Sequence, residues 1–401
     1  MAQMVYDSME HYTRDVGPAE KEYLTECEID IQNIGWTLGN DCPYRCRHCY
    51  SMSARKKGKD LDLATIDRVT NQIALLGAKT VNLGGNEPLF TNGPNPKNTL
   101  LPYIVSSLVN RGVDVGLTTS GISATYLEKY YPEEFHMLND VDISLDSPYE
   151  SEHNDNRGGK IFPMAIEALE ICKKHQKDFT IVMCAMNWNF TEDRIRELVK
   201  LARYYGSNVR INPIKPVEAE HMKTALNAEQ YYEGFSLLME LCDQLDLTEP
   251  TLSAVTQYQD SKRCPCGRKS FRIHSITPDG KIPISPCVYL HDYKVGNLLE
   301  DDLLDLIKSP QFQTFRRRNA HPEAILGCEE CEIVNLCGGG CASRAYLYNL
   351  HNNGERSLFS RDPFCPKDNP INVPFPYNPQ MEKVHLVHRD YLCTWIGRPK
   401  N

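Results

Sequence analysis

Cysteine is the residue whose chemistry this sequence offers most clearly, because eleven of its sixteen cysteines stand at short spacings. The first residues lack the basic and apolar segments of a secretion signal, so we expect a soluble cytoplasmic protein. In a reducing compartment, clustered thiols are more often metal ligands than disulfides. The cysteines outside the clusters are expected to be inert or small buried side chains; they are Cys27, Cys172, Cys184, Cys242 and Cys393.

The first cluster is Cys42, Cys46 and Cys49, in the segment CPYRCRHCY. Each iron of a 4Fe-4S cube needs one protein ligand, so three cysteines leave one iron open to a small molecule. An open coordination position distinguishes catalytic metal sites from structural ones. The alternative is a zinc ion held by the three thiolates together with His48 or a distant histidine.

The other clustered cysteines lie in the C-terminal half and are Cys264, Cys266, Cys287, Cys328, Cys331, Cys337, Cys341 and Cys365. Five residues separate Cys331 from Cys337, whereas zinc ribbons separate their pairs by about 15 to 20 residues. This spacing favours iron–sulfur ligation. Little apolar sequence lies between these cysteines, so the order of the region is expected to depend on bound metal.

The elements that must position the first cluster are predicted from hydrophobic pattern. Short apolar runs alternate with segments of helical period, which indicates βα units and a parallel sheet. The predicted strands are 34–38, 80–83, 114–118, 141–145, 179–186 and 208–211, and the predicted helices are 63–76, 100–110, 123–131, 161–175 and 191–205. Six units are too few for an eight-unit barrel, so we predict an α/β partial (β/α)6 TIM-like barrel, with a doubly wound sheet as the alternative. In both folds, the loops after the strands carry the chemistry.

We divide the chain into an N-terminal extension (1–33), the barrel (34–232), a connector (233–263), a small cysteine-rich domain (264–370) and a tail (371–401). Prolines in the tail predict extended chain there. The net charge is −9, from 44 Lys and Arg against 53 Asp and Glu, which gives no general attraction to nucleic acid. No apolar run is long enough to span a membrane.

Two basic runs are expected to have local roles. Arg55, Lys56, Lys57 and Lys59 follow the first cluster and are interpreted as a solvated face. The run Arg316 to Arg318 is predicted to cap the C-terminal end of a helix, where positive charge is favourable.

The first cluster resembles the signature of the radical S-adenosylmethionine (radical SAM) enzymes, C-x3-C-x-aromatic-C in the loop after the first strand. His48 stands at the aromatic position and Tyr50 follows the third cysteine. The family also has a Gly-Gly-Glu-Pro turn after the second strand, which is similar to Gly84, Gly85, Asn86, Glu87 and Pro88 with Asn86 inserted. Glycines let the backbone approach a bound amino acid closely enough to bind its ammonium group. The resemblance implies a 4Fe-4S cluster that binds S-adenosylmethionine.

Further along the barrel, Ser144 and Asp146 in DISLDS and Arg157 in NDNRGG resemble the family groups that reach the methionine carboxylate or the ribose. Ser120 in TTSGIS stands where the family often has Thr-Asn-Gly. The resemblance covers about residues 34 to 215 and implies reductive cleavage of S-adenosylmethionine to methionine and a 5′-deoxyadenosyl radical, which removes a hydrogen atom from the substrate. The electron would come from a donor such as flavodoxin or ferredoxin.

The C-terminal cysteines resemble the SPASM extension of some radical SAM enzymes, which holds auxiliary iron–sulfur clusters. The resemblance implies one 4Fe-4S cluster on Cys328, Cys331, Cys337 and Cys365, and a second on Cys266, Cys287 and Cys341 with Cys264 as fourth ligand. The chain would then hold three such clusters. Because two cysteines one residue apart fit a single cube poorly, an open iron in the second cluster is the alternative.

These resemblances imply an oxidoreductase that oxidatively modifies a peptide, by a crosslink or by oxidation of a residue. The alternatives are oxidation, epimerisation or rearrangement of a small metabolite, and a non-catalytic iron–sulfur or zinc protein. Sulfatase-maturing members have an acidic residue where this chain has Val288, and Tyr289, His291 or Asp292 are candidates to replace it. Only 41 residues precede Cys42, so a peptide substrate would need a separate leader-binding protein.

Overall fold

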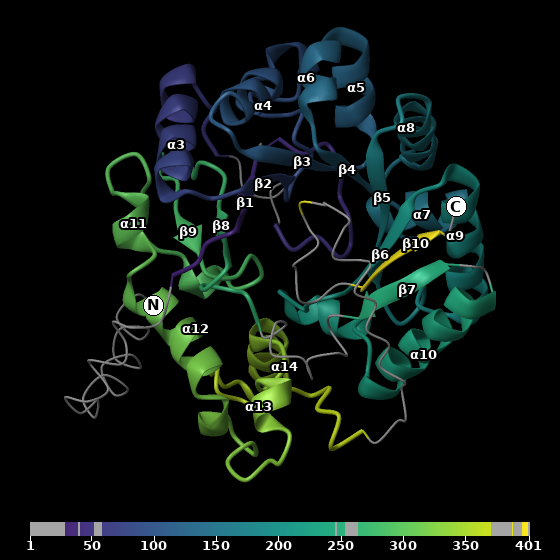
Figure 1. Cartoon of the computed structure of the whole chain (residues 1–401), viewed down its shortest axis with the longest axis vertical. Coiled ribbons are helices and arrows are strands. Elements are labelled where there is room, and N and C mark those ends of the chain that lie inside the picture. Colours follow the sequence, from purple (N-terminus) through teal and green to yellow (C-terminus); the bar gives the residue numbers. More distant parts are fainter. Residues whose placement is uncertain are drawn as a thin grey trace.

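Six parallel strands in chain order form the centre of the fold, a computed structural model that describes residues 29–38, 41–51, 58–244, 247–252, 264–369, 387 and 395–399. The strands are β1 (Asn33–Thr37), β2 (Thr80–Gly84), β3 (Asp114–Thr119), β4 (Asp140–Ser144), β5 (Asp178–Ala185) and β6 (Asn208–Pro213). Each pairs with its neighbours in sequence. Figure 1 shows that the sheet curves around an opening, as the predicted partial barrel requires.

Helices cover the outer face of this sheet (Figure 1). They are α3 (Leu63–Leu76), α4 (Leu101–Val109), α5 (Ile122–Tyr130), α6 (Pro132–Met137), α7 (Glu150–Arg157), α8 (Phe162–Lys174) and α9 (Glu192–Tyr205). Every predicted strand and helix of the barrel ends within two residues of an observed one. Helices α6 and α7 were not predicted. The preceding helix stops before Pro132, and the same proline begins α6. Helix α7 buries polar residues, so it has no apolar period to recognise.

The strands alternate between an apolar outer face and a polar inner face. On β4, Val141 and Ile143 belong to the main core, whereas Asp140 and Asp142 are buried polar residues of the inner face. Neighbouring strands repeat the pattern, because the register places Val141 beside Leu117 and Phe179. Side chains of a strand point alternately to its two faces, so apolar side chains pack against helices while polar ones face the barrel interior.

The sheet continues beyond the barrel on both edges. Strand β8 (Ser270–Ile273), from the cysteine-rich region, pairs in parallel with β1 and antiparallel with β9 (Ile284–Ser285). At the other edge, β10 (Trp395–Pro399) lies antiparallel between β6 and β7 (Leu247–Leu252). Strand β7 falls inside the segment expected to be a connector, after α10 (Ala228–Gln244). The N-terminal extension up to residue 28, the rest of the connector and the proline-rich part of the tail lie outside the described residues.

One residue of the tail packs near the amino ends of the barrel strands. Val387 is buried, and its carbonyl oxygen accepts a hydrogen bond of 2.8 Å from the Asn33 side chain. Its N–H donates to Asp140 Oδ1 at 3.1 Å. A Cβ atom on Gly116 would lie 2.8 Å from the Cβ of Val387. Val387 therefore packs against residues of β1, β3 and β4.

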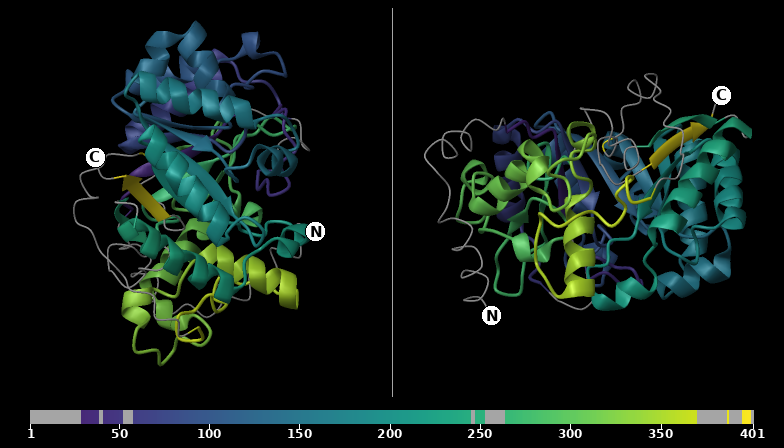
Figure 2. Two further views of the ribbon diagram at one scale, coloured as in Figure 1. Left: turned by 90° about the vertical axis from the view of Figure 1, so that its right-hand side faces the viewer. Right: turned by 90° about the horizontal axis from the view of Figure 1, so that it is seen from below.

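The cysteine-rich region contains α11 (Leu303–Leu306), α12 (Pro310–Ala320), α13 (Val334–Cys337) and α14 (Ala342–Asn353). Helices α12 to α14 lie across the opening from β3 and β4, and Figure 2 shows them gathered at one end of the molecule. Their separate core is small and includes Phe315, Tyr346 and Leu347. A small core agrees with a region whose order depends partly on metal.

Two arginines of α12 organise this region instead of capping their own helix. Arg318 is buried and donates to the carbonyl oxygens of Leu358, Gly339 and Gly340. Arg316 donates to the carbonyl oxygens of Gly267 and Ile307. The prediction of a capping role on α12 is therefore wrong for both. Of the other basic run, Lys59 is described, and Arg55, Lys56 and Lys57 lie outside the described residues.

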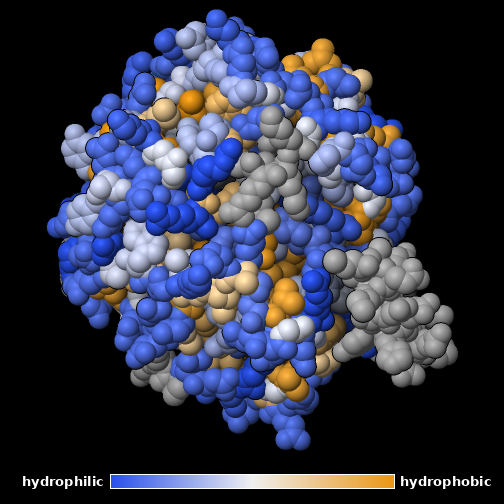
Figure 3. Space-filling model, turned by 180° about the vertical axis from the view of Figure 1, so that it is seen from behind, coloured by the Kyte–Doolittle hydropathy of each residue, from blue (hydrophilic) through white to orange (hydrophobic). Residues whose placement is uncertain are grey.

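The molecular surface is mainly hydrophilic when viewed from behind, with hydrophobic residues scattered over it (Figure 3). None of the described helices is both long enough and apolar enough to cross a bilayer.

Candidate active site

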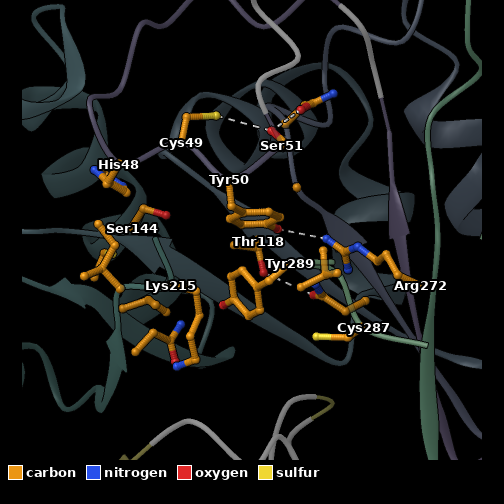
Figure 4. Close-up of a pocket in the computed structure, with 18 of the residues that line it drawn as sticks. His48, Cys49, Tyr50, Ser51, Thr118, Ser144, Lys215, Arg272, Cys287 and Tyr289 are labelled. Carbon is orange, nitrogen blue, oxygen red and sulfur yellow. Dashed lines mark hydrogen bonds between the residues drawn. The ribbon is translucent and has the colours of Figure 1, made fainter. Parts of the chain in front are cut away.

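A cavity of about 250 Å³ lies between the carboxyl ends of the barrel strands and the cysteine-rich region. Its lining combines residues from both parts of the chain, and Figure 4 shows part of this wall. The cysteines that line it are Cys42, Cys46, Cys49, Cys184, Cys264, Cys266, Cys287 and Cys341. Thus the first predicted cluster and half of the C-terminal cysteines face the same space.

The loop that carries the first three cysteines is fixed to the end of α7. The backbone N–H of Arg47 donates to the carbonyl oxygen of Asn156 at 3.0 Å. The backbone N–H of Arg45 donates to the carbonyl oxygen of Arg157 at 3.3 Å. Burial raises the pKa of the Cys42 thiol to about 11 and that of Cys46 to about 12. Such thiols ionise only beside a positive centre, as ligation to iron provides.

The position of His48 argues against the zinc alternative. Its Nδ1 lies 3.0 Å from the side-chain nitrogen of Asn156, and its Nε2 lies 3.6 Å from Asp146 Oδ2. Both ring nitrogens therefore contact the buried network of the barrel, although the imidazole also lines the cavity. Within the described segments, no three His, Cys, Asp or Glu side chains converge as the ligands of one metal ion do. Cysteines that each bind a different iron of a cube need not converge in that way.

The glycine turn after β2 requires glycine at one position. Gly85 has φ +91°, and a Cβ atom there would lie 2.5 Å from Thr37 Oγ1 and 2.9 Å from Arg272 Nη2. A side chain would therefore be strained and would also clash. Gly85, Asn86 and Glu87 line the cavity, whereas Gly84 ends β2 and is not in the lining.

Glu87 connects this turn to the loop after β3. Its Oε1 accepts hydrogen bonds from Thr119 Oγ1 at 2.5 Å and from the Ser123 hydroxyl, and its Oε2 accepts from the backbone N–H of Ser120 at 2.9 Å. Ser120 itself lines the cavity. The predicted residues Glu87 and Ser120 thus form one hydrogen-bonded wall beside Cys42.

Asp146 lies behind the cavity wall and holds Arg157. Its carboxylate is fully buried and accepts from Arg157 Nε at 2.7 Å and Nη2 at 3.1 Å, and from Asn156 at 3.0 Å. Burial opposes its ionisation, but the charges of Arg157 and His48 outweigh it and keep the pKa of Asp146 below the ordinary range. Asp146 is not in the cavity lining, whereas Ser144 and Arg157 are. This placement makes Asp146 a positioning residue for Arg157.

Two cavity residues, Arg272 and Lys215, were not singled out from the sequence. Arg272, on β8, donates hydrogen bonds to Thr37 Oγ1 at 2.9 Å and to the Tyr50 hydroxyl at 3.1 Å. The Tyr50 ring meets the Tyr289 ring edge to face, with 5.2 Å between centroids. Lys215, after β6, lies 5.8 Å from the centroid of Tyr289. The parallel pairing of β8 with β1 places Arg272 there, and the sequence has no signal for that pairing.

The three candidates to replace the missing acidic residue have different positions. Tyr289 and Val288 line the cavity. His291 Nε2 lies 2.8 Å from the carbonyl oxygen of Tyr50, and Asp292 accepts from the hydroxyl of Tyr346 and forms an ion pair with Arg356. His291 and Asp292 are absent from the lining, so only Tyr289 faces the reaction space among these three described residues.

Four C-terminal cysteines form what we name the near group: Cys264, Cys266, Cys287 and Cys341. The Cys266 thiol donates hydrogen bonds to Cys264 and Cys287, and these raise the pKa of Cys266 well above the usual value. The hydrogen bond from Cys266 lowers the pKa of Cys264, against burial and the charge of Cys341. Cys264 therefore lies with the other three thiols of the near group.

The remaining four form the far group: Cys328, Cys331, Cys337 and Cys365. None of them lines the cavity. Burial raises the pKa of Cys328, and the charges of Cys365 and Cys331 raise it further. Burial raises the pKa of Cys337 to about 11, with contributions from Asp362, Cys365 and Cys328.

The cysteines outside these groups differ in position. Cys172 is buried in the core, as expected for an inert thiol, whereas Cys184 lines the cavity. Cys27 and Cys393 lie outside the described residues, and the structure does not describe the side chain of Cys242. None of the cysteines in the described segments forms a disulfide.

Comparisons with known proteins agree with this geometry. The family described as the radical SAM superfamily matches residues 36–202, and the SPASM family, described as an iron–sulfur cluster-binding domain, matches residues 264–332. The mycofactocin maturase of Mycolicibacterium smegmatis is 25% identical over 347 residues, which are 83% of this chain and 82% of that protein. The PqqA peptide cyclase of Methylobacterium nodulans is 24% identical over 327 residues, which are 77% of this chain and 80% of that protein.

The solved structure of Streptococcus suis SuiB bound to precursor peptide SuiA has the same fold. The TM-score is 0.63 at 15% identity, and the match covers 86% of this chain and 77% of SuiB. With both families matched in chain order and the cysteines of both regions in one cavity, the chain is a radical SAM enzyme with a C-terminal SPASM domain, which uses S-adenosylmethionine on a 4Fe-4S cluster and holds auxiliary iron–sulfur.

Proposed function

We propose that this enzyme is a maturase that oxidatively modifies a peptide, by forming a crosslink or by oxidising a residue. The observation that carries the proposal is the single cavity lined by the first cysteine cluster and by the near group. A substrate in that space can be next to both groups at once. Two relatives that match most of this chain are named as a maturase and a peptide cyclase, which supports a peptide over a small metabolite.

The cysteines of the chain suit three 4Fe-4S clusters. Cys42, Cys46 and Cys49 would hold the cluster that binds S-adenosylmethionine, and the near and far groups would hold one auxiliary cluster each. When bound, the first cluster and S-adenosylmethionine supply the 5′-deoxyadenosyl radical that removes a hydrogen atom from the substrate.

The remaining residues bind and orient. Arg157 and Ser144 line the cavity and would hold the methionine carboxylate, with Asp146 fixing the guanidinium of Arg157. Gly85 and Asn86 line the cavity, and the backbone of this turn would bind the ammonium group. Tyr50 and Tyr289 place two aromatic rings between the first cluster and the near group, which excludes water from the reacting carbon.

The position after Cys287 restricts the type of product. Val288 lines the cavity and cannot accept a proton, so a reaction that needs a carboxylate base there is not supported. An electron donor such as flavodoxin or ferredoxin and a separate leader-binding protein would complete the system.

The test uses protein reconstituted with iron and sulfide without oxygen. With dithionite, it should cleave S-adenosylmethionine, and peptides encoded beside its gene, labelled with deuterium, should transfer deuterium into 5′-deoxyadenosine. The Cys46→Ala variant should lose cleavage, and Cys172→Ala, a change in the core, should keep it. Deuterium transfer from a small metabolite and from no peptide would contradict the proposal.

A further inference from the structure

Lys215 is a buried cation without a carboxylate. Only 2% of it is exposed, and its ammonium donates to the carbonyl oxygen of Pro213 at 3.2 Å. The Tyr289 ring centroid lies 5.8 Å from Nζ, and Cys184 of the cavity wall lies close enough for the Lys215 charge to act on its thiol. No carboxylate of the described residues forms an ion pair with Lys215. Burying an ammonium without a counter-charge is unfavourable, so a negatively charged ligand in the cavity would stabilise Lys215.

Three other buried cations of the described segments are paired with carboxylates, although Nε of Arg210 and Nη1 of Arg344 have no hydrogen-bond partner. Arg157 pairs with Asp146, Arg210 with Asp142 at 2.7 Å, and Arg344 with Asp362 at 2.6 Å. Even Arg272, which has no carboxylate, binds the hydroxyl groups of Thr37 and Tyr50. An ammonium group has three N–H donors, and Lys215 uses one of them within the protein.

The position of Lys215 indicates a ligand in the cavity. It lies two residues beyond the end of β6 and is part of the cavity lining, as are Tyr50, Tyr289 and Cys287. In Figure 4, Lys215 and Tyr289 lie on the opposite side of Tyr50 from Cys49. Arg157 and Ser144 are already suited to the methionine carboxylate, so Lys215 is left for the second molecule in the cavity.

The surroundings of Lys215 fit a carboxylate better than a phosphate. One ammonium beside an aromatic ring suits a compact anion of single charge. Phosphate sites usually combine arginine forks or several backbone N–H groups, and the guanidinium of the nearby Arg210 is already paired with Asp142.

We propose that Lys215 binds a carboxylate of the peptide substrate, either the C-terminal carboxylate or that of an Asp or Glu side chain. This inference rests on the proposed function, because it assigns the recognition of the substrate in the same cavity. Lys215 is thus a specificity-determining residue, and it places the modified carbon relative to the first cluster by anchoring one end of the peptide.

The test measures retention of peptide mixtures on the reconstituted enzyme with S-adenosylmethionine bound. Three mixtures of N-acetylated hexapeptides are compared. The first has free C-terminal carboxylates and no Asp or Glu, the second has C-terminal carboxamides and no Asp or Glu, and the third has carboxamides and one Glu. Lys215→Met removes the charge while keeping the length of the chain. Lys129→Met, on the exposed surface of α5, is the matched control.

The wild type should retain the first or the third mixture about ten-fold more than the second, since a charge-assisted hydrogen bond contributes roughly that factor or more. Which of the two is retained identifies the source of the carboxylate. Lys215→Met should lose the preference, Lys215→Arg should recover part of it, and Lys129→Met should keep it.

Several outcomes would overturn the assignment. If the wild type shows no preference for carboxylates, the assignment is wrong, and this result does not depend on whether a variant folds. The assignment is also wrong if Lys215→Met keeps the preference for carboxylates. If that variant also shifts the reduction potential of an auxiliary cluster, the charge of Lys215 acts on the cluster instead. Weaker binding of S-adenosylmethionine with unchanged peptide preference would place Lys215 at the cosubstrate instead. Cleavage of S-adenosylmethionine by the wild type is measured in parallel, and its absence would contradict the proposed function rather than the subsite.

Discussion

The near and far cysteine groups contain four thiols each, but they stand in different surroundings. Every thiol of the near group lines the cavity that contains the first cluster, and no thiol of the far group does. The near group is attached to the barrel through the pairing of β8 with β1. The far group follows α12 and is held by arginines such as Arg361, whose Nη2 lies 3.5 Å from Cys365 Sγ.

This difference indicates different roles for two similar sets of cysteines. A group in the cavity wall can touch the substrate and accept its electron directly. A group outside the wall can affect the reaction only through the near group or through the fold. The buried Asp362 joins the two, because it accepts from the backbone N–H of Cys341 at 2.8 Å and its charge acts on Cys337.

The largest expected effect follows from replacing one cysteine in each group. Cys287→Ser in the near group should lower product formation below about 1% of the wild type while S-adenosylmethionine is still cleaved. Cys331→Ser in the far group should remove a similar amount of iron and lower product formation less. Iron content, 5′-deoxyadenosine and product are measured on the same samples. Equal loss of product in both variants, with equal protein stability, would remove the distinction.

The sequence predicted both groups as sets of cysteines but not their surroundings. Spacing is local information, and it was enough to separate Cys42, Cys46 and Cys49 from the later cysteines. Whether a thiol lines the cavity depends on the pairing of β8 with β1, and residues 270–273 show no pattern that selects this partner. The polar Arg272 in that strand even argues against a buried central strand.

The barrel itself was predictable because each unit repeats one pattern. Apolar outer positions such as Val141 and Ile143 mark the strands, and glycines such as Gly77 and Gly206 mark the helix ends. Polar inner positions gave no such signal. Lys215 and the pairing of Asp146 with Arg157 became visible only when the strands were placed side by side, since charge partners far apart in sequence leave no local trace.

A change at Asp362 should affect both groups through the fold. In the wild type, both carboxylate oxygens of Asp362 accept hydrogen bonds of 2.6 Å from the Arg344 guanidinium. Asp362→Asn leaves this buried guanidinium without a counter-charge. The expected loss is about 3 kcal/mol of unfolding free energy or more. It is measured as a lower denaturation midpoint together with faster release of iron.

Asp368→Asn is the matched control for this change. Asp368 pairs with Arg361 at 2.6 Å near the far group, but its side chain is 51% exposed. Exposed pairs contribute roughly 0 to 1 kcal/mol, so the midpoint should move little. If the two variants were destabilised equally, Asp362 would not be the residue that joins the near and far groups.

The smallest expected effect lies at the amino ends of the barrel strands, away from both groups. Burial and the charge of Asp142 raise the pKa of Asp140 to about 7. Unfolded, the same carboxyl has a pKa of about 3.9. Between these values the unfolded chain releases the proton and the folded chain keeps it, so the folded state loses stability as pH rises from about 4 to about 7 and is constant on either side.

Asp140→Asn should remove this dependence and keep an oxygen to accept from the N–H of Val387. Relative to the wild type, the variant should gain about 2 kcal/mol in unfolding free energy between pH 5 and pH 8. Asp155→Asn, in the exposed pair with Arg47, should show no such trend. Because Asp140 touches neither the near nor the far group, product formed per iron-loaded protein should stay unchanged while stability shifts. A change in product yield that followed the pH trend would mean that the amino end of the barrel acts on the cavity, and the contrast between the two cysteine groups would then not be local to the cavity wall.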